Sequence, residues 1–179
     1  MADAAATADT DEAVSNDAAQ AAGPTAYGVP CSDERGQLVV YPSRDEYLAA
    51  IGMAAVDGFE MCVDVCAVDN LTNRTRSLPH GVTPERFEVV VNLLDMRGRR
   101  RLRVRTQVPA DDPQVPSLVG LYQGVEAPER EASDLFGIAF CDHPDPSRIL
   151  LPPDWEGHPL RKDYGIGAIP VQFKAVEGR

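Results

Sequence analysis

Apolar and polar residues alternate with a period of two in the middle of the chain. This is the period of a β-strand that has one buried and one solvated face. Between residues 99 and 108 the two predicted faces consist of Leu102, Val104, Thr106 and Val108, and of Arg101, Arg103 and Arg105. The preceding run from Phe87 to Met96 is rich in valine, and Arg97-Gly98 supplies a turn. We therefore predict a β-hairpin over residues 87–108.

Two less regular patterns precede this hairpin. Residues 60–69 predict a strand whose buried side consists of Met61, Val63, Val65 and Ala67. Ser43, followed three residues later by Glu46, is a capping-box signature that predicts the start of a helix. The buried face of that helix is expected to consist of Tyr47, Leu48 and Ile51, and Gly52 is expected to end it. Residues 70–83 are interpreted as a loop.

A second helix is predicted after a loop over residues 109–116 and a short helical piece over residues 117–122. Pro128 suits the first turn of the second helix, and Glu129 and Glu131 suit its positive end. Its expected buried side consists of Ala132, Leu135 and Phe136, and Gly137 ends it. A last short strand is expected over residues 138–141. Residues 31–142 therefore predict an α+β domain, a two-layer mixed β-sheet with helices on one face.

The character of the sequence changes after residue 142. Residues 143–174 contain six prolines, which end both helical and strand periodicity. The same segment carries the only tryptophan of the chain together with several large apolar residues. A solvated disordered tail does not have this composition. We interpret residues 143–179 as an extended arm that buries its apolar side chains on a partner surface.

Composition adds a third segment at the other end of the chain. The 179 residues have a formal net charge of −11. Residues 1–30 contain five acidic residues and no Lys or Arg, namely Asp3, Asp9, Asp11, Glu12 and Asp17. They also contain few apolar residues, so we expect a disordered acidic tail. The tail lacks the features of a signal or transit peptide, and no apolar run is long enough to span a membrane.

The four cysteines, Cys31, Cys62, Cys66 and Cys141, are expected to be free thiols in a reducing compartment. Cys62 and Cys66 have the same parity, so a strand would place them on one face. A metal or iron–sulfur site needs four clustered ligands. One loose pair and two distant single cysteines do not supply them, so no metal or cofactor is expected.

Three clusters of polar residues remain as candidate sites. The sequence Asp142-His143-Pro144-Asp145 places an imidazole between carboxylates, and a hydrolase centre or a capped turn would both account for it. The charges around Glu131 and Asp134 fit acid–base chemistry, a solvated helix face or a charged partner contact. The arginine stripe at residues 101, 103 and 105 could bind phosphates. The adjoining sequence lacks aromatic residues for stacking on bases and the chain is acidic, so nucleic acid is not expected.

The densest cluster lies in the arm, at residues 155–164. It reads Trp-Glu-Gly-His-Pro-Leu-Arg-Lys-Asp-Tyr. Trp, Tyr and Arg are the residue types that are enriched at the hot spots of protein–protein interfaces. The arm therefore indicates binding rather than catalysis.

Several motifs resemble a known family. Residues 129–138 read Glu-Arg-Glu-Ala-Ser-Asp-Leu-Phe-Gly-Ile, followed by His143-Pro144-Asp145. Then come Arg-Ile-Leu-Leu-Pro at residues 148–152 and Asp-Trp-Glu-Gly-His-Pro-Leu-Arg-Lys-Asp-Tyr at residues 154–164. This pattern resembles the 30 kDa subunit of respiratory complex I, the NADH-quinone oxidoreductase. The resemblance is dense over residues 129–164 and fainter from about residue 43.

The resemblance implies a structural subunit without flavin, iron–sulfur cluster or quinone of its own. Such a subunit lies in the peripheral arm of the complex, on the cytoplasmic face of the bacterial membrane, and packs on the 49 kDa subunit near the quinone site. Equivalent subunits of membrane-bound hydrogenases and of complexes with other electron donors remain an alternative. The expected partner contacts are Glu129, Arg130, Glu131, Asp134, Trp155, Arg161, Lys162, Asp163 and Tyr164.

Overall fold

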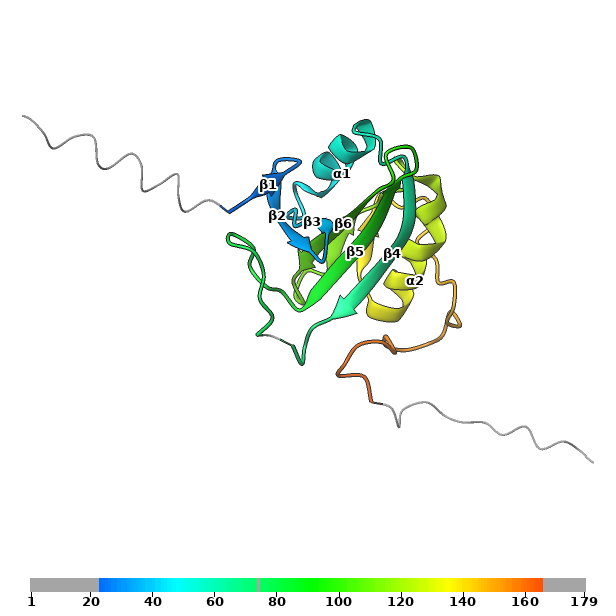
Figure 1. Cartoon of the computed structure of the whole chain (residues 1–179). Coiled ribbons are helices and arrows are strands. Elements are labelled where there is room, and N and C mark those ends of the chain that lie inside the picture. The colour runs from blue at the N-terminus through cyan, green and yellow to red at the C-terminus, as the bar shows by residue number, and fades with distance from the viewer. Residues whose placement is uncertain (1–22, 74, 166–179) are drawn as a thin grey trace, which may run out of the picture.

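A six-stranded mixed β-sheet forms the centre of the molecule (Figure 1). The structure, a computed structural model, describes residues 23–73 and 75–165. The sheet has the order β1-β2-β3-β6-β5-β4, and its neighbours are antiparallel except for the parallel pair β3 and β6. The elements are β1 Thr25–Ala26, β2 Val29–Glu34, β3 Gln37–Val40, α1 Tyr47–Val56, β4 Met61–Asp69, β5 Phe87–Asp95, β6 Arg100–Val108, β7 Gln114–Pro116, η1 Gln123–Val125, α2 Glu126–Phe136 and β8 Ala139–Cys141.

Strands β5 and β6 form the predicted hairpin. Val91 lies opposite Val104, and both side chains are buried. The turn follows Asp95, whose carboxylate accepts the backbone N–H of Gly98 at 2.7 Å. A Cβ atom on Gly98 would collide with that carboxylate, so the close approach requires glycine at this position. The period-two pattern of β6 therefore identified both its buried face and its partner strand.

Strand β4 departs from the predicted pattern because it contains a bulge. Its pairing with β5 shifts register between Cys62 and Asp64, which moves the residues before the shift to the opposite face. Of the predicted buried side, the exposed members are Met61 and Val63 and the buried members are Val65 and Ala67. The predicted shared face for Cys62 and Cys66 is therefore wrong: Cys62 is half-buried and Cys66 is exposed. All four cysteines of the described chain are free thiols.

The chain before residue 42 forms strands that the sequence pattern did not predict. β2 and β3 pair as an antiparallel hairpin around Arg35-Gly36, and β1 adds two residues beside β2. Residues 25–30, which the sequence placed in the acidic tail, therefore belong to the sheet, and the ordered chain begins before residue 31. Strands of two to six residues are too short for periodicity to reveal. Residues 1–22 of the predicted tail lie outside the described residues.

Helix α1 follows the predicted capping box. The Ser43 hydroxyl accepts the N–H of Glu46 at 3.3 Å, and the Glu46 carboxylate accepts the N–H of Ser43 at 3.0 Å. The helix continues through Gly52 to Val56, so the predicted end was wrong. Leu48 is 42% exposed rather than buried. The buried face consists of Tyr47, Ala50, Ile51 and Ala54, because small alanines let the helix approach the sheet.

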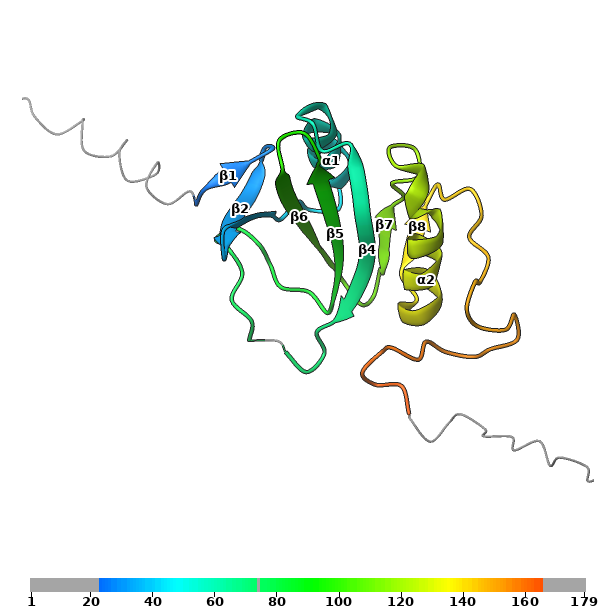
Figure 2. The same ribbon diagram turned by 45° about the vertical axis from the view of Figure 1, so that its right-hand side comes forward.

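The predicted short helix over residues 117–122 is instead a turn that leads into η1 and α2. β7 and β8 flank this segment and form a separate parallel pair. α2 ends at Gly137, whose φ of +70° is the left-handed conformation of a helix C-cap, as predicted. Figure 2 shows α2 alongside β4.

One continuous hydrophobic core joins the sheet to both helices. It includes Ile51 of α1, Ala132 of α2, and Leu102 and Val104 of β6. The strand residues in this core lie on the same face of β6, opposite the arginine stripe. The predicted α+β architecture, with a mixed sheet and helices over one face, is confirmed.

Candidate partner-binding surface

Glu129 of α2 is a buried carboxylate, although its surroundings in the sequence are charged. Its side chain is 0% exposed. Its two carboxylate oxygens accept the Leu118 N–H at 2.7 Å and the Ser117 hydroxyl at 2.6 Å. Burial raises the pKa of Glu129 above its ordinary value, against these two hydrogen bonds. Glu129 therefore holds the turn before α2, which explains why residues 117–122 do not form a helix.

Asp134 is the second buried carboxylate of α2 and lies beneath the C-terminal arm, which we define as residues 143–165. It is 3% exposed. One oxygen accepts the backbone N–H groups of Ile149, Leu150 and Leu151 at 3.3, 3.0 and 2.8 Å, and the other pairs with Arg148. Burial opposes ionisation, but these donors outweigh it and lower the pKa of Asp134. Asp134 thus binds the arm through its backbone.

Arg130 supports the first part of the arm from the same helix. Its guanidinium donates to the carbonyl oxygen of Ser147 at 3.0 Å and pairs with Asp145 at 3.2 Å. A weaker contact of 3.9 Å joins it to Glu126, one turn earlier on α2. Glu131, by contrast, is exposed. Arg130 therefore contacts the arm of its own chain, whereas Glu131 remains available at the surface.

His143 fits the turn interpretation better than the hydrolase interpretation. Its Nδ1 accepts the N–H of Asp145 at 3.1 Å, so Nε2 carries the proton and donates to the carbonyl oxygen of Glu126 at 3.1 Å. The side chain is almost fully buried, 3.9 Å from the carboxylate of Glu129. The hollow beside it has a volume of about 10 Å³, which is too small for a substrate. His143 braces the turn between β8 and the arm.

The second part of the arm covers the end of α2. His158 Nδ1 lies 2.9 Å from the carbonyl oxygen of Asp134, and the N–H of Leu160 donates to the carbonyl oxygen of Leu135 at 3.1 Å. The Arg161 guanidinium donates to the carbonyl oxygen of Phe136 at 2.6 Å. Helix C-termini leave such carbonyl groups without partners and favour positive charge. The arm therefore caps α2.

The arm ends in a clasp at the far end of β4. The Asp69 carboxylate accepts the backbone N–H of Lys162 at 2.9 Å and pairs with Arg86 at 2.9 Å. Arg86 also pairs with Asp163 at 2.7 Å, and the two carboxylates raise the pKa of its guanidinium. The Arg86 guanidinium lowers the pKa of Asp163 in turn. Two loops far apart in the sequence are joined here by one arginine.

The predicted aromatic anchors lie partly on their own chain. Trp155 and Tyr164 are half-buried. The indole N–H of Trp155 is buried without a hydrogen-bond partner among the described residues. A Cβ atom on Gly157 would lie 2.8 Å from the Tyr164 ring, so this glycine permits close packing of the aromatic side chain. Both rings therefore keep part of their surface free.

The arm also exposes apolar residues that were absent from the predicted contacts. Leu150 is 55% exposed, Leu160 is 47% exposed and Ile149 is 39% exposed. Their backbone groups are bonded to α2 while their side chains remain accessible. Fixed apolar side chains on a segment with satisfied backbone are typical of a docking surface. The apolar content of the proline-rich segment was the signal that could have identified them.

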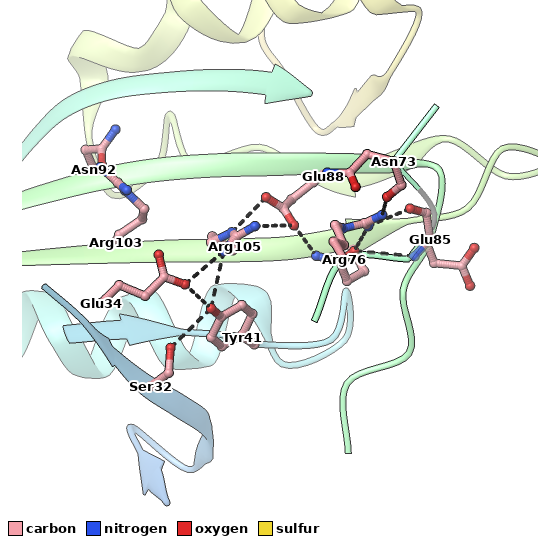
Figure 3. A network of polar contacts seen from close by, with 11 residues as sticks. Ser32, Glu34, Tyr41, Asn73, Arg76, Glu85, Glu88, Asn92, Arg103 and Arg105 are labelled. Carbon is pink, nitrogen blue, oxygen red and sulfur yellow. Dashed lines mark hydrogen bonds and ion pairs between the residues drawn. The ribbon is translucent and has the colours of Figure 1, made fainter. Parts of the chain in front are cut away.

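The outer face of the sheet carries the predicted arginine stripe (Figure 3). Arg105 pairs with the buried carboxylate of Glu88 at 2.8 Å and with Glu34 at 3.0 Å, while Arg103 donates to the side chain of Asn92 at 3.1 Å. These two arginines use their donors within the sheet. The stripe therefore does not present the row of free guanidinium groups that a nucleic-acid backbone would require.

Neither a metal site nor a membrane span is found in the described part of the chain. Within residues 23–73 and 75–165, no three His, Cys, Asp or Glu side chains are grouped closely enough to hold a metal ion. The α-helices described here, of 10 and 11 residues, are too short to cross a bilayer.

The fold and the arm together define a class: an α+β domain with a mixed sheet and an extended C-terminal segment that packs back over its second helix. A family model described as respiratory-chain NADH dehydrogenase, 30 kDa subunit, matches residues 40–169. The chain belongs to this family. The match includes the domain from the end of β3 onward and the whole described arm.

Curated relatives agree with this assignment. The chain is 41% identical to the C-type subunit of NADH-quinone oxidoreductase from Saccharopolyspora erythraea, over 80% of this chain and 55% of the relative. It is 40% identical to the same subunit from Bordetella petrii, over 84% and 78% of the two chains. It is 39% identical to NADH-quinone oxidoreductase subunit 5 of Thermus thermophilus, over 86% and 73%. The chain thus spans about half the length of some curated relatives and about three quarters of others.

Two solved structures resemble the fold. A trypsin-resistant fragment of Nqo5 superimposes with a TM-score of 0.57 at 34% identity, covering 66% of this chain and 89% of the fragment. A chain of the membrane-bound sulfane sulfur reductase, an archaeal respiratory membrane complex, superimposes with a TM-score of 0.64. That likeness covers 84% of this chain and 89% of the other at 21% identity, and it shows a shared fold.

Proposed function

We propose that this chain is a non-catalytic structural subunit of the peripheral arm of a proton-translocating NADH-quinone oxidoreductase. In this role it packs on the 49 kDa subunit near the quinone site and supports electron transfer from NADH to quinone. It lies at the cytoplasmic face of a bacterial membrane, attached through the complex. The match of residues 40–169 to the family model carries the proposal, because it includes both the domain and the arm.

The geometry of the arm supports this role. The buried carboxylates of Glu129 and Asp134 bind the chain's own backbone, so we assign them to positioning the surface. The contacts to the partner then come from exposed groups on that surface. From the predicted set we retain Arg130, Glu131, Trp155, Arg161, Lys162, Asp163 and Tyr164, and we add the exposed side chains of Leu150 and Leu160.

The test is co-assembly with the 49 kDa subunit. We expect the double variant Leu150→Ser, Leu160→Ser to unfold at the same denaturant concentration as the native chain, because both side chains are already exposed. We expect the same variant to lose most of its co-purification with the 49 kDa subunit. Leu48→Ser is the matched control, since Leu48 is 42% exposed on α1, away from the arm. Equal assembly of the double variant and the control would overturn the proposed surface.

An equivalent subunit of a related complex with another electron donor is the second candidate. The fold shared with the sulfane sulfur reductase complex favours it as the alternative. The two candidates differ in what accompanies the chain from native membranes. Co-purification with an NADH-oxidising subunit supports the first, and its replacement by a hydrogenase or another reductase module supports the second.

A further inference from the structure

Three arginines without ion-pair partners among the described residues gather at one end of the sheet. They are Arg35 in the β2–β3 turn, Arg99 in the β5–β6 turn and Arg101 near the start of β6, and we call them the arginine cluster. Together with Arg100 they line a hollow of about 630 Å³. Eight other described arginines bond to a carboxylate, a carbonyl or an amide oxygen, namely Arg44, Arg76, Arg86, Arg103, Arg105, Arg130, Arg148 and Arg161. Uncompensated positive charge is therefore concentrated at this end.

Two of these arginines occupy turn positions that favour glycine or asparagine. Arg35 has a φ of +58° and Arg99 a φ of +51°, both in the left-handed region. A non-glycine residue pays roughly 1–2 kcal/mol to adopt this conformation. Turn geometry gives no reason for arginine at either position. The long charged side chain is what these two positions supply.

The acids around the hollow are already engaged. The Asp57 carboxylate accepts the Tyr27 hydroxyl at 2.7 Å and pairs with Arg100 at 2.9 Å. Asp95 also pairs with Arg100, at 2.8 Å. The Asp33 carboxylate accepts a backbone N–H within its own turn. Their charges leave the arginine cluster without a direct carboxylate contact in the described chain.

The chain itself contains a segment of the opposite charge. Residues 1–22 carry five acids and no Lys or Arg, although the whole chain already has a net charge of −11. This segment leads into the sheet at β1, and Tyr27 directly after β1 lines the hollow. A chain of 22 residues can span up to about 70 Å, and a tethered ligand has an effective concentration of roughly millimolar. Reach and charge therefore both favour an intramolecular contact.

We propose that the acidic segment of residues 1–22 binds the arginine cluster of the same chain. The contact consists of carboxylates against guanidinium groups at the rim of the hollow. It covers the positive end of the sheet, at the opposite end from the clasp formed by Asp69 and Arg86, and keeps that end from binding other anionic surfaces.

The test compares two ¹⁵N-labelled full-length variants by NMR. In the first, Asp9, Asp11 and Asp17 become Asn and Glu12 becomes Gln. At about 20 mM salt we expect shifted amide and guanidinium signals at Arg35, Arg99 and Arg101 relative to the native chain, and coincident spectra near 500 mM salt, where the Debye length is only a few ångströms. The matched control neutralises four exposed acids of the body instead, by Asp111→Asn, Asp142→Asn, Asp154→Asn and Glu156→Gln. It should leave the cluster signals unchanged.

A second comparison shows whether the acidic segment and the cluster act together. On an Arg35→Gln, Arg99→Gln, Arg101→Gln background, neutralising the acidic segment should shift none of the signals from the two turns. Coincident low-salt spectra of the native and tail-neutralised chains would overturn the proposal. It would also be overturned if phosphatidylserine vesicles bound the native chain as tightly as the tail-neutralised chain and did so through the cluster, because a lipid surface would then be the occupant.

Discussion

The carboxylate of Asp69 accepts the backbone N–H of Lys162 at 2.9 Å, across 93 positions of sequence. Asp69 closes β4, and the arm returns to that point after passing over α2 (Figure 1). Arg86 joins the same carboxylate to Asp163 and completes the clasp. The path of the arm is thus determined by buried acceptors on the domain rather than by any secondary structure of its own.

The two acids of this clasp should contribute unequally. Asp69 is buried, so Asp69→Asn weakens an acceptor that water cannot replace, and we expect a loss of about 1–3 kcal/mol in the free energy of unfolding. Asp163 is half exposed, so Asp163→Asn should cost less than about 1 kcal/mol. Urea denaturation followed by circular dichroism measures both. Equal losses would show that the burial of Asp69 does not matter.

Asp134 should be the strongest single support of the arm. Asp134→Asn removes the charge that three N–H groups and Arg148 share, and we expect a loss of about 2–4 kcal/mol in unfolding free energy. Hydrogen exchange at the amides of residues 149–151 should accelerate at the same time. Asp154→Asn is the control, because Asp154 is exposed. Unchanged exchange in the Asp134 variant would contradict this account of the arm.

Gly137 should not tolerate a side chain. Its φ of +70° disfavours any other residue, and an added Cβ would collide with the side chains of His158 and Arg161. We expect Gly137→Ala to lower the free energy of unfolding by about 1–3 kcal/mol and to displace the arm. Gly120→Ala serves as the control, since no atom lies within 4 Å of its added Cβ. Similar stability of the two variants would refute the required close approach.

Glu129 should make stability fall as pH rises through the mildly acidic range. Its pKa in the folded chain lies above the ordinary value of 4.5, so above that pH the unfolded chain loses this proton first. Stability then decreases until the folded group also ionises. The lowered pKa values of Asp69 and Asp134 act in the opposite sense, but only as pH falls below about 3.8. The window above pH 5 therefore isolates Glu129.

The measurement compares the free energy of unfolding of the native chain and Glu129→Gln between about pH 5 and 8. We expect the variant to gain relative to the native chain as pH rises, by about 1.4 kcal/mol for each unit of raised pKa. His143 faces Glu129 at 3.9 Å, so the same pair is measured again with His143→Gln. Parallel curves for the two proteins in both backgrounds would refute the effect.

Local patterns were sufficient for much of the fold. The alternation in β6 identified the central hairpin, the capping box located α1, and Gly137 marked the end of α2. The motifs at residues 129–164 indicated the family, which the family model confirmed. The failures have one cause: β2 and β3 are too short for periodicity to reveal, and the bulge in β4 inverts the alternation that would otherwise assign its faces.

By itself, the sequence determined the hairpin, the second helix and the presence of an apolar arm, because these depend on residues close together in the chain. Only the tertiary structure decided that Glu129 and Asp134 are buried, since their partners lie 11 to 17 residues away on segments without periodic pattern. A charged residue in a sequence is read as solvated unless its donors can be seen. The backbone groups that make burial of these carboxylates favourable become visible only after the chain has folded around them.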